Sequence, residues 1–366
     1  MGSPLRIVAV AGARPNFMKI APIANQIARA RDRFALTLVH TGQHYDEKLS
    51  KVFFEELGIP KPDVNLEVGS GSHAQQTAAV MAAFEPVVLE HRPEMVLVVG
   101  DVNSTIACAL VAVKLGTTVV HVEAGLRSFD RTMPEEINRV LTDQISDLLF
   151  TTEASAADNL QREGIALDKV HFCGNVMIDT LLAHRERARA LGSVGKYSLQ
   201  PRSYGLLTLH RPSNVDDPAT LEALLNGIAA VAADVPLLFP VHPRTRPMIE
   251  RSPIARAMAG RGQLRTLDPL GYLEFIGLMD ESRVVLTDSG GVQEETTILG
   301  GPCLTLRHNT ERPVTVTHGT NRIVGTDSAK IREAWNAVRD GQIEARTPPL
   351  WDGHAAERIV DVLGRV

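Results

Sequence analysis

The segment from Val284 to Glu295, with the sequence VVLTDSGGVQEE, has the residue types of a phosphate-binding turn. An apolar β-branched run leads into Ser289, Gly290 and Gly291, and a helix that opens with carboxylates is predicted to follow. Glycines let backbone N–H groups approach an anion closely, and the positive end of that helix would face the same point. Glu295, one turn into the helix, could accept hydrogen bonds from sugar hydroxyls. The segment favours a diphosphate with an attached ribose, and an ordinary strand-to-helix turn is the alternative.

Ionisable side chains also stand at the ends of five other predicted strands. They are Arg14 with Lys19, Asp101, Glu123, His210 with Arg211, and His242. Any one of them could be a solvated loop residue or a helix cap, but the set together indicates a site. Among the cations, Arg14, Lys19 and Arg312 could neutralise a diphosphate, since arginine suits bidentate contacts to phosphate oxygens.

Three carboxylates could serve as general acids or bases if burial raises their pKa toward neutrality: Asp101, Glu123 and Glu135. Glu135 and Glu136 follow Pro134, and a proline followed by two glutamates is also an ordinary helix start. That purely structural interpretation stays open for Glu135, and more so for Glu136. The residues alone do not decide which carboxylate takes a proton.

Several other chemistries lack their sequence signatures. The first turn, Gly12-Ala-Arg-Pro15, is not a G-x-G-x-x-G fingerprint, and no Walker or G-x-S-x-G pattern occurs, so nicotinamide, ATP and serine-hydrolase chemistry are disfavoured. The histidines His40, His44 and His121 have no zinc-type spacing and are predicted to be capping or core residues. We therefore expect no metal and no cofactor.

Length and composition favour a two-domain cytoplasmic enzyme. The chain has 366 residues, 44% hydrophobic and 22% charged, and a net charge of −5 that argues against nucleic-acid binding. Its three cysteines (Cys108, Cys173 and Cys303) are far apart in sequence, which is typical of buried thiols in a reducing compartment. The sequence contains no apolar run of the ~20 residues that a membrane helix needs.

Short β-branched runs alternate with helical patterns, which predicts parallel sheets covered by helices. The expected strands are 5–11, 36–41, 95–100, 119–123, 148–151, 171–173, 205–209, 237–241, 264–267, 284–287 and 303–306. The same rhythm occurs twice, and a helix-like stretch at 179–189 precedes an irregular stretch at 192–203. We therefore predict an α/β fold with two Rossmann-like domains, 1–178 and 179–352, that face a central cleft.

Taken together and in order, the segments resemble the non-hydrolysing UDP-N-acetylglucosamine 2-epimerases over nearly the whole chain. The matching segments are 12–19 (GARPNFMK), 41–44 (TGQH), 100–101 (GD), 121–127 (HVEAGLR), 134–139 (PEEINR), 208–211 (TLHR), 288–295 (DSGGVQEE) and 310–313 (TERP). The resemblance implies a fold like that of the GT-B glycosyltransferases, with UDP held mainly by the second domain. It also implies that a C-terminal helix, about 353–366, completes the first domain, and that the protein is a homodimer.

Carried over by position, the resemblance assigns roles to residues of both domains. The catalytic positions are Asp101, Glu123, Glu135 and His210, with Lys19 near them. The substrate-binding positions are Arg14, Arg139, His242, Leu270, Phe275, Ser289, Gly290, Gly291, Glu295 and Arg312. Among these, Arg14 and Arg312 would contact the phosphates, and Phe275 with the backbone of Leu270 would frame the uracil.

The implied reaction interconverts UDP-GlcNAc and UDP-ManNAc by eliminating UDP to 2-acetamidoglucal and adding it back. The same epimerisation of another UDP-sugar, such as a 2,3-diacetamido uronic acid, is the close alternative. A hydrolysing epimerase, a GT-B glycosyltransferase and a UDP-sugar-binding regulator are the others. The chain departs from common relatives at Ala13, at 128–131 and at 43–49, where Tyr45 stands in place of a typical arginine. The last difference predicts weak or absent activation by UDP-GlcNAc.

Overall fold

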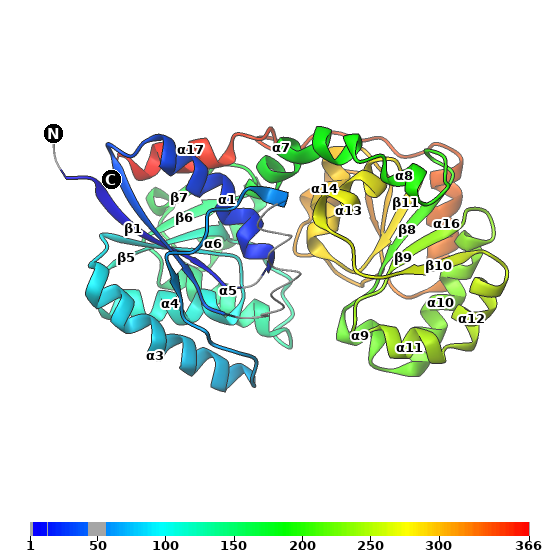
Figure 1. Ribbon diagram of the computed structural model, residues 1–366, viewed down its shortest axis with the longest axis horizontal. Coiled ribbons are helices and arrows are strands. Elements are labelled where there is room, and N and C mark those ends of the chain that lie inside the picture. Colours follow the sequence, from blue (N-terminus) through cyan, green and yellow to red (C-terminus); the bar gives the residue numbers. More distant parts are fainter. Residues whose placement is uncertain (1–2, 13, 43–55, 366) are drawn as a thin grey trace. The chain divides into compact units, whose positions relative to one another are not determined.

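The computed structural model describes residues 3–12, 14–42 and 56–365, with the side chain of Arg14 outside the description. The chain divides into two compact units, one made of Met1–Ala183 with Pro349–Val366 and the other of His184–Pro348. Each unit is a parallel sheet flanked by helices (Figure 1), which confirms the predicted α/β class with two Rossmann-like folds. Within the described ranges, no helix combines the length and the apolar character needed to cross a membrane.

The sheet of the first unit has seven parallel strands in the order β3-β2-β1-β4-β5-β6-β7. Along the chain they are β1 (Leu5–Ala11), β2 (Phe34–His40), β3 (Val64–Asn65), β4 (Met95–Val99), β5 (Thr118–Ala124), β6 (Leu148–Thr151) and β7 (Val170–Phe172). The helices are α1 (Arg14–Arg29), α3 (His73–His91), α4 (Asn103–Lys114), α5 (Pro134–Gln144), α6 (Ala154–Arg162), α7 (Val176–Ala190) and α17 (Ala355–Leu363). In this unit α17 packs on α1, and α3, α4 and α5 pack side by side.

The sheet of the second unit has six parallel strands in the order β10-β9-β8-β11-β12-β13. They are β8 (Gly205–Thr208), β9 (Leu237–Pro240), β10 (Leu264–Leu267), β11 (Val284–Thr287), β12 (Cys303–Thr305) and β13 (Asn321–Ile323). The helices are α8 (Ser193–Lys196), α9 (Pro212–Val215), α10 (Pro218–Ala232), α11 (Arg246–Arg251), α12 (Pro253–Gly260), α13 (Tyr272–Asp280), α14 (Gly290–Leu299), α15 (Val314–Thr317) and α16 (Ser328–Arg339). Here α10 contacts α12 and α16, whereas α13 contacts α14.

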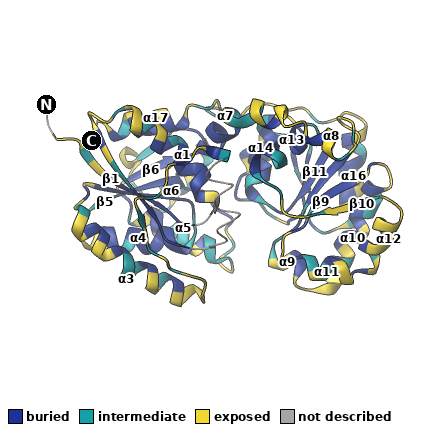
Figure 2. Cartoon of the chain, in the orientation of Figure 1, coloured by how far each residue is buried: buried dark blue, intermediate teal, exposed yellow. Residues whose placement is uncertain are grey.

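The central strands are buried because their side chains are apolar on both faces (Figure 2). All five residues of β4 and all four of β11 are buried. In the first sheet, strands β2 and β3 are added on one side of β1 and β4 onward on the other side. In the second sheet, β9 and β10 lie on one side of β8 and β11 onward on the other. In such sheets ligands bind at the carboxyl ends of the two strands that flank the point where the strand order reverses. Those strands are β1 with β4, and β8 with β11, so the loops after them are where a site is expected.

The eleven predicted strands all occur, with ends that differ by at most two residues. Two short strands, β3 and β13, were not predicted, because neither has a run of apolar β-branched residues. The stretch 192–203 was predicted to be irregular, and the structure instead contains one helical turn there, α8, whose start is enabled by the left-handed conformation of Gly192. The three cysteines are free and buried.

Candidate active site

Glu123 and Lys19 form a buried ion pair in the first unit. Glu123 lies at the end of β5 and Lys19 lies in α1, and the Lys19 ammonium contacts the Glu123 carboxylate. Their side chains are only 3% and 10% exposed, respectively. Burying such a pair costs free energy unless the two groups contact each other closely, as they do here. The structure therefore brings together two residues that the sequence predicted to be catalytic.

The backbone of Glu123 has an unusual conformation. Its φ is +71°, in the left-handed region, and the register of β5 against β6 shifts between Val122 and Ala124. A left-handed non-glycine residue costs on the order of 1 kcal/mol and persists only where the surroundings hold it. The bulge aims the Glu123 side chain toward Lys19 rather than along the regular alternation of the strand. Strain of this kind is typical of functional positions.

Asp101 follows β4 and belongs to a second ion-pair network. Its carboxylate accepts a hydrogen bond from Arg139 Nη2 at 2.5 Å, and Arg139 Nη1 donates to Glu136 at 2.8 Å. Arg139 and Glu136 are buried, whereas the Asp101 side chain is 26% exposed. Arg139 therefore holds the Asp101 carboxylate in place, and the Asp101 side chain remains partly exposed.

Glu136 organises the loop before α5. Its carboxylate accepts from the backbone N–H and hydroxyl of Ser128 at 2.9 Å and from the N–H of Phe129 at 2.8 Å. These contacts fit the interpretation that Glu136 has a purely structural role at the start of the helix. Glu135, its neighbour, is half-buried in the first turn of α5, which begins at Pro134.

In the second unit, the turn after β11 opens onto the start of α14. Ser289 caps the helix without a side-chain hydrogen bond, and its own N–H donates to Thr287 Oγ1 at 2.9 Å. The first N–H groups of a helix have no partner within it, so those of Gly290 and Gly291 suit an anion. A Cβ atom placed on Gly290 would lie 2.7 Å from Arg312 Nη1. The arginine thus covers the helix start, and only glycine leaves room for it.

Buried carboxylates hold Arg312 in this position. Arg312 Nε donates to Glu294 at 2.6 Å, and Glu311 lies 3.6 Å from Arg312 Nη1. Glu311 in turn accepts two hydrogen bonds from Arg307, at 2.8 and 2.9 Å. Arginine can make several such contacts from one planar group. The guanidinium is thereby oriented before any ligand arrives.

His210 follows β8 and is oriented by Asp288, the residue after β11. Its Nδ1 lies 2.9 Å from Asp288 Oδ1, and the Asp288 carboxylate also accepts from the N–H groups of His210 and Arg211. Burial alone would raise the pKa of Asp288, but the His210 hydrogen bond and these N–H groups hold it below its usual value. A fixed carboxylate that orients one ring nitrogen leaves the other to act on a substrate. The His210 side chain is 42% exposed.

Glu295 is a buried carboxylic acid in α14. Burial raises the pKa of Glu295 to about 8, with nearby Glu294 adding to the rise and the Tyr272 hydroxyl opposing it. At neutral pH the Glu295 side chain is therefore mainly uncharged. A neutral carboxyl can donate and accept hydrogen bonds without repelling a phosphate.

The raised pKa of Glu295 predicts a pH-dependent stability. The unfolded chain has the ordinary value of 4.5, so the contribution of Glu295 is fully present below pH 4.5 and is lost as pH rises through about 8. At about 1.4 kcal/mol per pKa unit, the loss amounts to a few kcal/mol. Chemical unfolding at pH 5.5 and 8.5 should show a larger loss for the wild type than for Glu295→Gln. Equal losses in the two proteins would contradict the assignment.

Three other predicted residues lie around the second sheet. Leu270 and Phe275 flank the start of α13 and are half-buried, and His242 follows β9 and is exposed. Arg14 begins α1, but its side chain lies outside the described part of the structure. Residues 43–55, which include the segment 43–49 on which the activation prediction rests, also lie outside it. Neither the uracil contact nor the activation prediction is tested by the structure.

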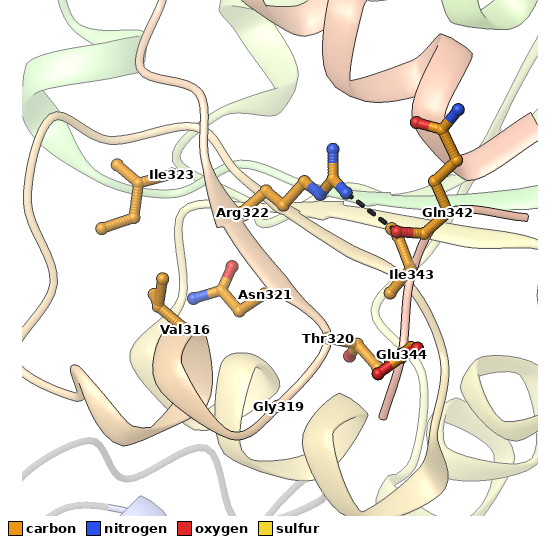
Figure 3. Close-up of a pocket in the computed structure, with 9 residues that line it drawn as sticks. All are labelled: Val316, Gly319, Thr320, Asn321, Arg322, Ile323, Gln342, Ile343 and Glu344. Atoms are coloured by element: carbon orange, nitrogen blue, oxygen red, sulfur yellow. Dashed lines mark hydrogen bonds between the residues drawn. The ribbon is translucent and has the colours of Figure 1, made fainter. Parts of the chain in front are cut away.

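A pocket of about 430 Å³ lies beside the edge strand β13 (Figure 3). The Arg322 side chain extends toward Gln342 and donates to the Gln342 carbonyl at 3.1 Å (Figure 3). The lining residues come from 316–323 and 342–344 and include none of the predicted site residues. Within the described ranges, no group of three or more His, Cys, Asp or Glu side chains could hold a metal ion.

Sequence reasoning did not assign roles to several residues that organise these groups. Asp288 was recognised only as part of a segment, although its place directly after a buried strand was a usable signal. Glu294 contacts Arg312 over 18 residues, and Tyr272 contacts Glu295 from another helix, so no local pattern indicates either contact. Arg307 and Glu311 pair across four residues of one loop, where no regular spacing predicts a pair.

Known proteins resemble the chain over nearly its full length. A family model for UDP-N-acetylglucosamine 2-epimerase matches residues 26–364. A UDP-N-acetylglucosamine 2-epimerase homolog of Methanococcus maripaludis is 43% identical, with 98% of this chain and 99% of the relative covered. The UDP-2,3-diacetamido-2,3-dideoxy-D-glucuronate 2-epimerase of Pseudomonas aeruginosa is 41% identical over 99% of this chain and all of its own. The crystal structure of Methanocaldococcus jannaschii UDP-GlcNAc 2-epimerase with UDP-GlcNAc and UDP has a TM-score of 0.91 at 40% identity, and covers 99% of this chain and 100% of its own.

Two parallel Rossmann-like sheets and a glycine-rich helix start beside a held arginine are typical of an α/β protein that binds a phosphate-containing ligand. The family model and the sequence identity to known relatives then show which family this is. The chain belongs to the UDP-N-acetylglucosamine 2-epimerase family, which confirms the predicted resemblance.

Proposed function

We propose that the protein is a non-hydrolysing UDP-GlcNAc 2-epimerase that interconverts UDP-GlcNAc and UDP-ManNAc. The buried pair of Lys19 and Glu123 carries the proposal, because it supplies a preformed acid/base group beside the strained end of β5. A binding regulator would gain nothing from burying these charges, since burying an ion pair costs free energy unless the pair serves another purpose. A glycosyltransferase would likewise have no need of Asp101, Glu123 and Glu135 together.

The second unit supplies the groups for UDP. The N–H groups of Gly290 and Gly291 bind the diphosphate together with Arg312, and the family resemblance adds Arg14 as a residue that contacts the phosphates. Glu295 binds the ribose, and Leu270 and Phe275 frame the uracil. The oriented Arg312 guanidinium and the open start of α14 support this assignment. Ser289, Arg139 and His242 complete the proposed substrate-binding set.

The reaction requires UDP to act as a leaving group. A base takes the proton from C2, the C1–O bond breaks with its electron pair remaining on the phosphate, and a C1–C2 double bond forms as 2-acetamidoglucal. UDP then adds back to C1 while C2 receives a proton on the opposite face. Phosphate-binding cations stabilise the departing charge. Asp101, Glu123 and Glu135, with Lys19 and His210, provide the acids and bases.

The role of His210 is tested most cleanly by an asparagine substitution. The amide that His210→Asn introduces can replace the Nδ1–H bond to Asp288 but not the second ring nitrogen. His210→Asn should therefore lower kcat by about 10²-fold or more, the usual contribution of an acid/base group. The UDP dissociation constant should change little in isothermal titration. Wild-type turnover in this variant would make His210 a spectator.

The UDP-sugar itself has a second candidate, because the Pseudomonas aeruginosa relative bears the name of a diacetamido-glucuronate epimerase at 41% identity. Each UDP-sugar can be incubated with the protein and the products separated by chromatography. We expect UDP-ManNAc from UDP-GlcNAc. Conversion of the diacetamido uronate alone would move the proposal to that substrate, and release of free ManNAc with UDP would indicate a hydrolysing enzyme.

A homodimer and a cytoplasmic location are also part of the proposal. The dimer is expected from the family resemblance, and the location from the composition and the free cysteines. Light scattering on the purified protein should give twice the chain mass of 39.7 kDa. A monomer mass at micromolar concentration would contradict the dimer.

A further inference from the structure

A buried histidine–aspartate pair lies in the first unit and has no role in the proposed chemistry. His121, in β5, and Asp143, in α5, are 0% and 1% exposed, and His121 Nδ1 lies 2.6 Å from Asp143 Oδ1. Burying two ionisable groups is costly unless their contacts are needed. The contacts of this pair reach the backbone beside both Asp101 and Glu123.

On one side the pair anchors the loop after β4. His121 Nε2 lies 2.8 Å from the carbonyl oxygen of Gly100, the residue before Asp101. A carbonyl only accepts, so Nε2 carries a hydrogen and donates it. Gly100 has a φ of +68°, and its N–H donates to the Val122 carbonyl. The imidazole therefore fixes the orientation of the peptide that leads into Asp101.

On the other side the pair anchors the loop after β5. Asp143 Oδ2 accepts from the N–H of Gly125 at 3.1 Å and pairs with Arg127 Nη2 at 2.7 Å. Arg127 is also held by Glu163, at 2.6 and 2.8 Å. Gly125 lies two residues after Glu123, and a Cβ on it would come within 2.5 Å of the Ala156 carbonyl oxygen. One carboxylate thus ties the loop of Glu123 to the imidazole that holds the loop of Asp101.

Both loops depend on such anchors because their backbones are strained or confined. Glu123 and Gly125 have φ values of +71° and +78° on either side of Ala124. Glu123, which is not a glycine, keeps this left-handed conformation only when neighbouring groups fix it. Gly125 adopts it without strain but is confined by the Ala156 carbonyl. Acid/base groups lose much of their effect when displaced, since a shift of ~1 Å can cost about 10² in rate.

We propose that His121 and Asp143 are positioning residues that set the separation of Asp101 and Glu123 for epimerisation. Neither is placed to touch the substrate, and they act through the backbone of Gly100 and Gly125. The expected change in kcat rests on the proposed function. The expected loosening of the loops that carry Asp101 and Glu123 does not depend on it.

Two substitutions at position 121 separate the two hydrogen bonds. The amide of His121→Asn can replace Nδ1–H toward Asp143 but cannot reach Gly100, whereas the amide of His121→Gln can replace Nε2–H toward Gly100. We expect His121→Asn to lower kcat by about 10- to 100-fold with KM and UDP affinity within about 2-fold. His121→Gln should retain kcat within about 3-fold. Equal kcat values in the two variants would overturn the proposal.

Variants of Asp143 provide a second pair if an exchange at position 121 prevents folding. Asp143→Asn can donate to His121 and accept from Gly125, whereas Asp143→Leu has a similar size and no polar atom. Arg127 stays paired with Glu163 in both. The proposal predicts kcat near wild type for asparagine and a loss of about 10-fold or more for leucine. Equal kcat values in these two proteins would overturn it.

Amide hydrogen exchange distinguishes failure of this inference from failure of the proposed function. Peptides covering 100–103 should exchange faster in His121→Asn than in His121→Gln, and those covering 123–127 faster in Asp143→Leu than in Asp143→Asn. These outcomes do not depend on turnover, so they test the positioning role even if the wild type fails to convert UDP-GlcNAc. Equal exchange within each pair would contradict the role, and a wild type without turnover would contradict only the function.

Discussion

Replacing Glu123 with glutamine is expected to lower kcat by at least about 10³-fold, within the range that acid/base groups contribute. The amide has nearly the same size as the carboxylate but can neither take a proton nor balance the charge of Lys19. Both side chains are buried, so water cannot take over either role. UDP affinity should stay within about 3-fold by isothermal titration, because Glu123 is not among the groups proposed to bind UDP.

The matched control is Glu94→Gln. Glu94 pairs with Arg6 at the surface of the same unit, at 2.6 Å and about half exposed. An exposed pair contributes little, so kcat and stability should stay near wild type. Loss of UDP affinity in Glu123→Gln would reassign Glu123 to binding, and full activity in that variant would remove it from the chemistry.

Replacing Gly290 with alanine is expected to raise the dissociation constant of UDP by about 10-fold or more. The new Cβ would lie 2.7 Å from Arg312 Nη1, so the guanidinium must move away from the start of α14. Arg312 is held by Glu294 and Glu311, and it cannot shift without weakening those bonds. An arginine contact to phosphate is charge-assisted and worth roughly 1.5–3 kcal/mol, which corresponds to this loss.

Gly301→Ala is the control for Gly290→Ala. Gly301 lies in the same unit, between α14 and β12, and a Cβ there would meet no atom within 4 Å. The Gly301→Ala variant should have the same dissociation constant for UDP as the wild type. If Gly290→Ala also binds UDP normally, then Arg312 is not a phosphate ligand and the anion site lies elsewhere.

The fold was predictable because its strands are locally encoded. Val284–Thr287 and Leu148–Thr151 are short apolar runs, and the structure gives them the predicted bounds. The strands β3 and β13 were not predicted because they are only two and three residues long and contain polar residues. β3 includes Asn65, and β13 includes Asn321 and Arg322, so neither has an apolar pattern of its own. The pairing of an edge strand is set by the rest of the sheet rather than by its own residues.

The site was predictable as a list of residues but not as a set of contacts. Polar residues directly after strands, such as Asp101 and His210, follow from the rule that parallel sheets place ligands there. The residues that pair with them do not follow from this rule, because Arg139 lies 38 residues from Asp101 and Asp288 lies 78 residues from His210. Arg139 was predicted to bind substrate, and the structure places it in an ion pair with Asp101 and Glu136. Such long-range pairs depend on packing, which sequence spacing does not contain.

The proposed epimerase reaction is best tested by turnover of UDP-GlcNAc in deuterium oxide, followed by proton NMR of the anomeric and C2 positions. Elimination and re-addition must exchange the C2 proton with solvent. We expect UDP-ManNAc with deuterium at C2, and deuterium entering the recovered UDP-GlcNAc as equilibrium is reached. UDP-ManNAc that keeps the original C2 proton, or no change in UDP-GlcNAc, would contradict the proposed epimerase reaction.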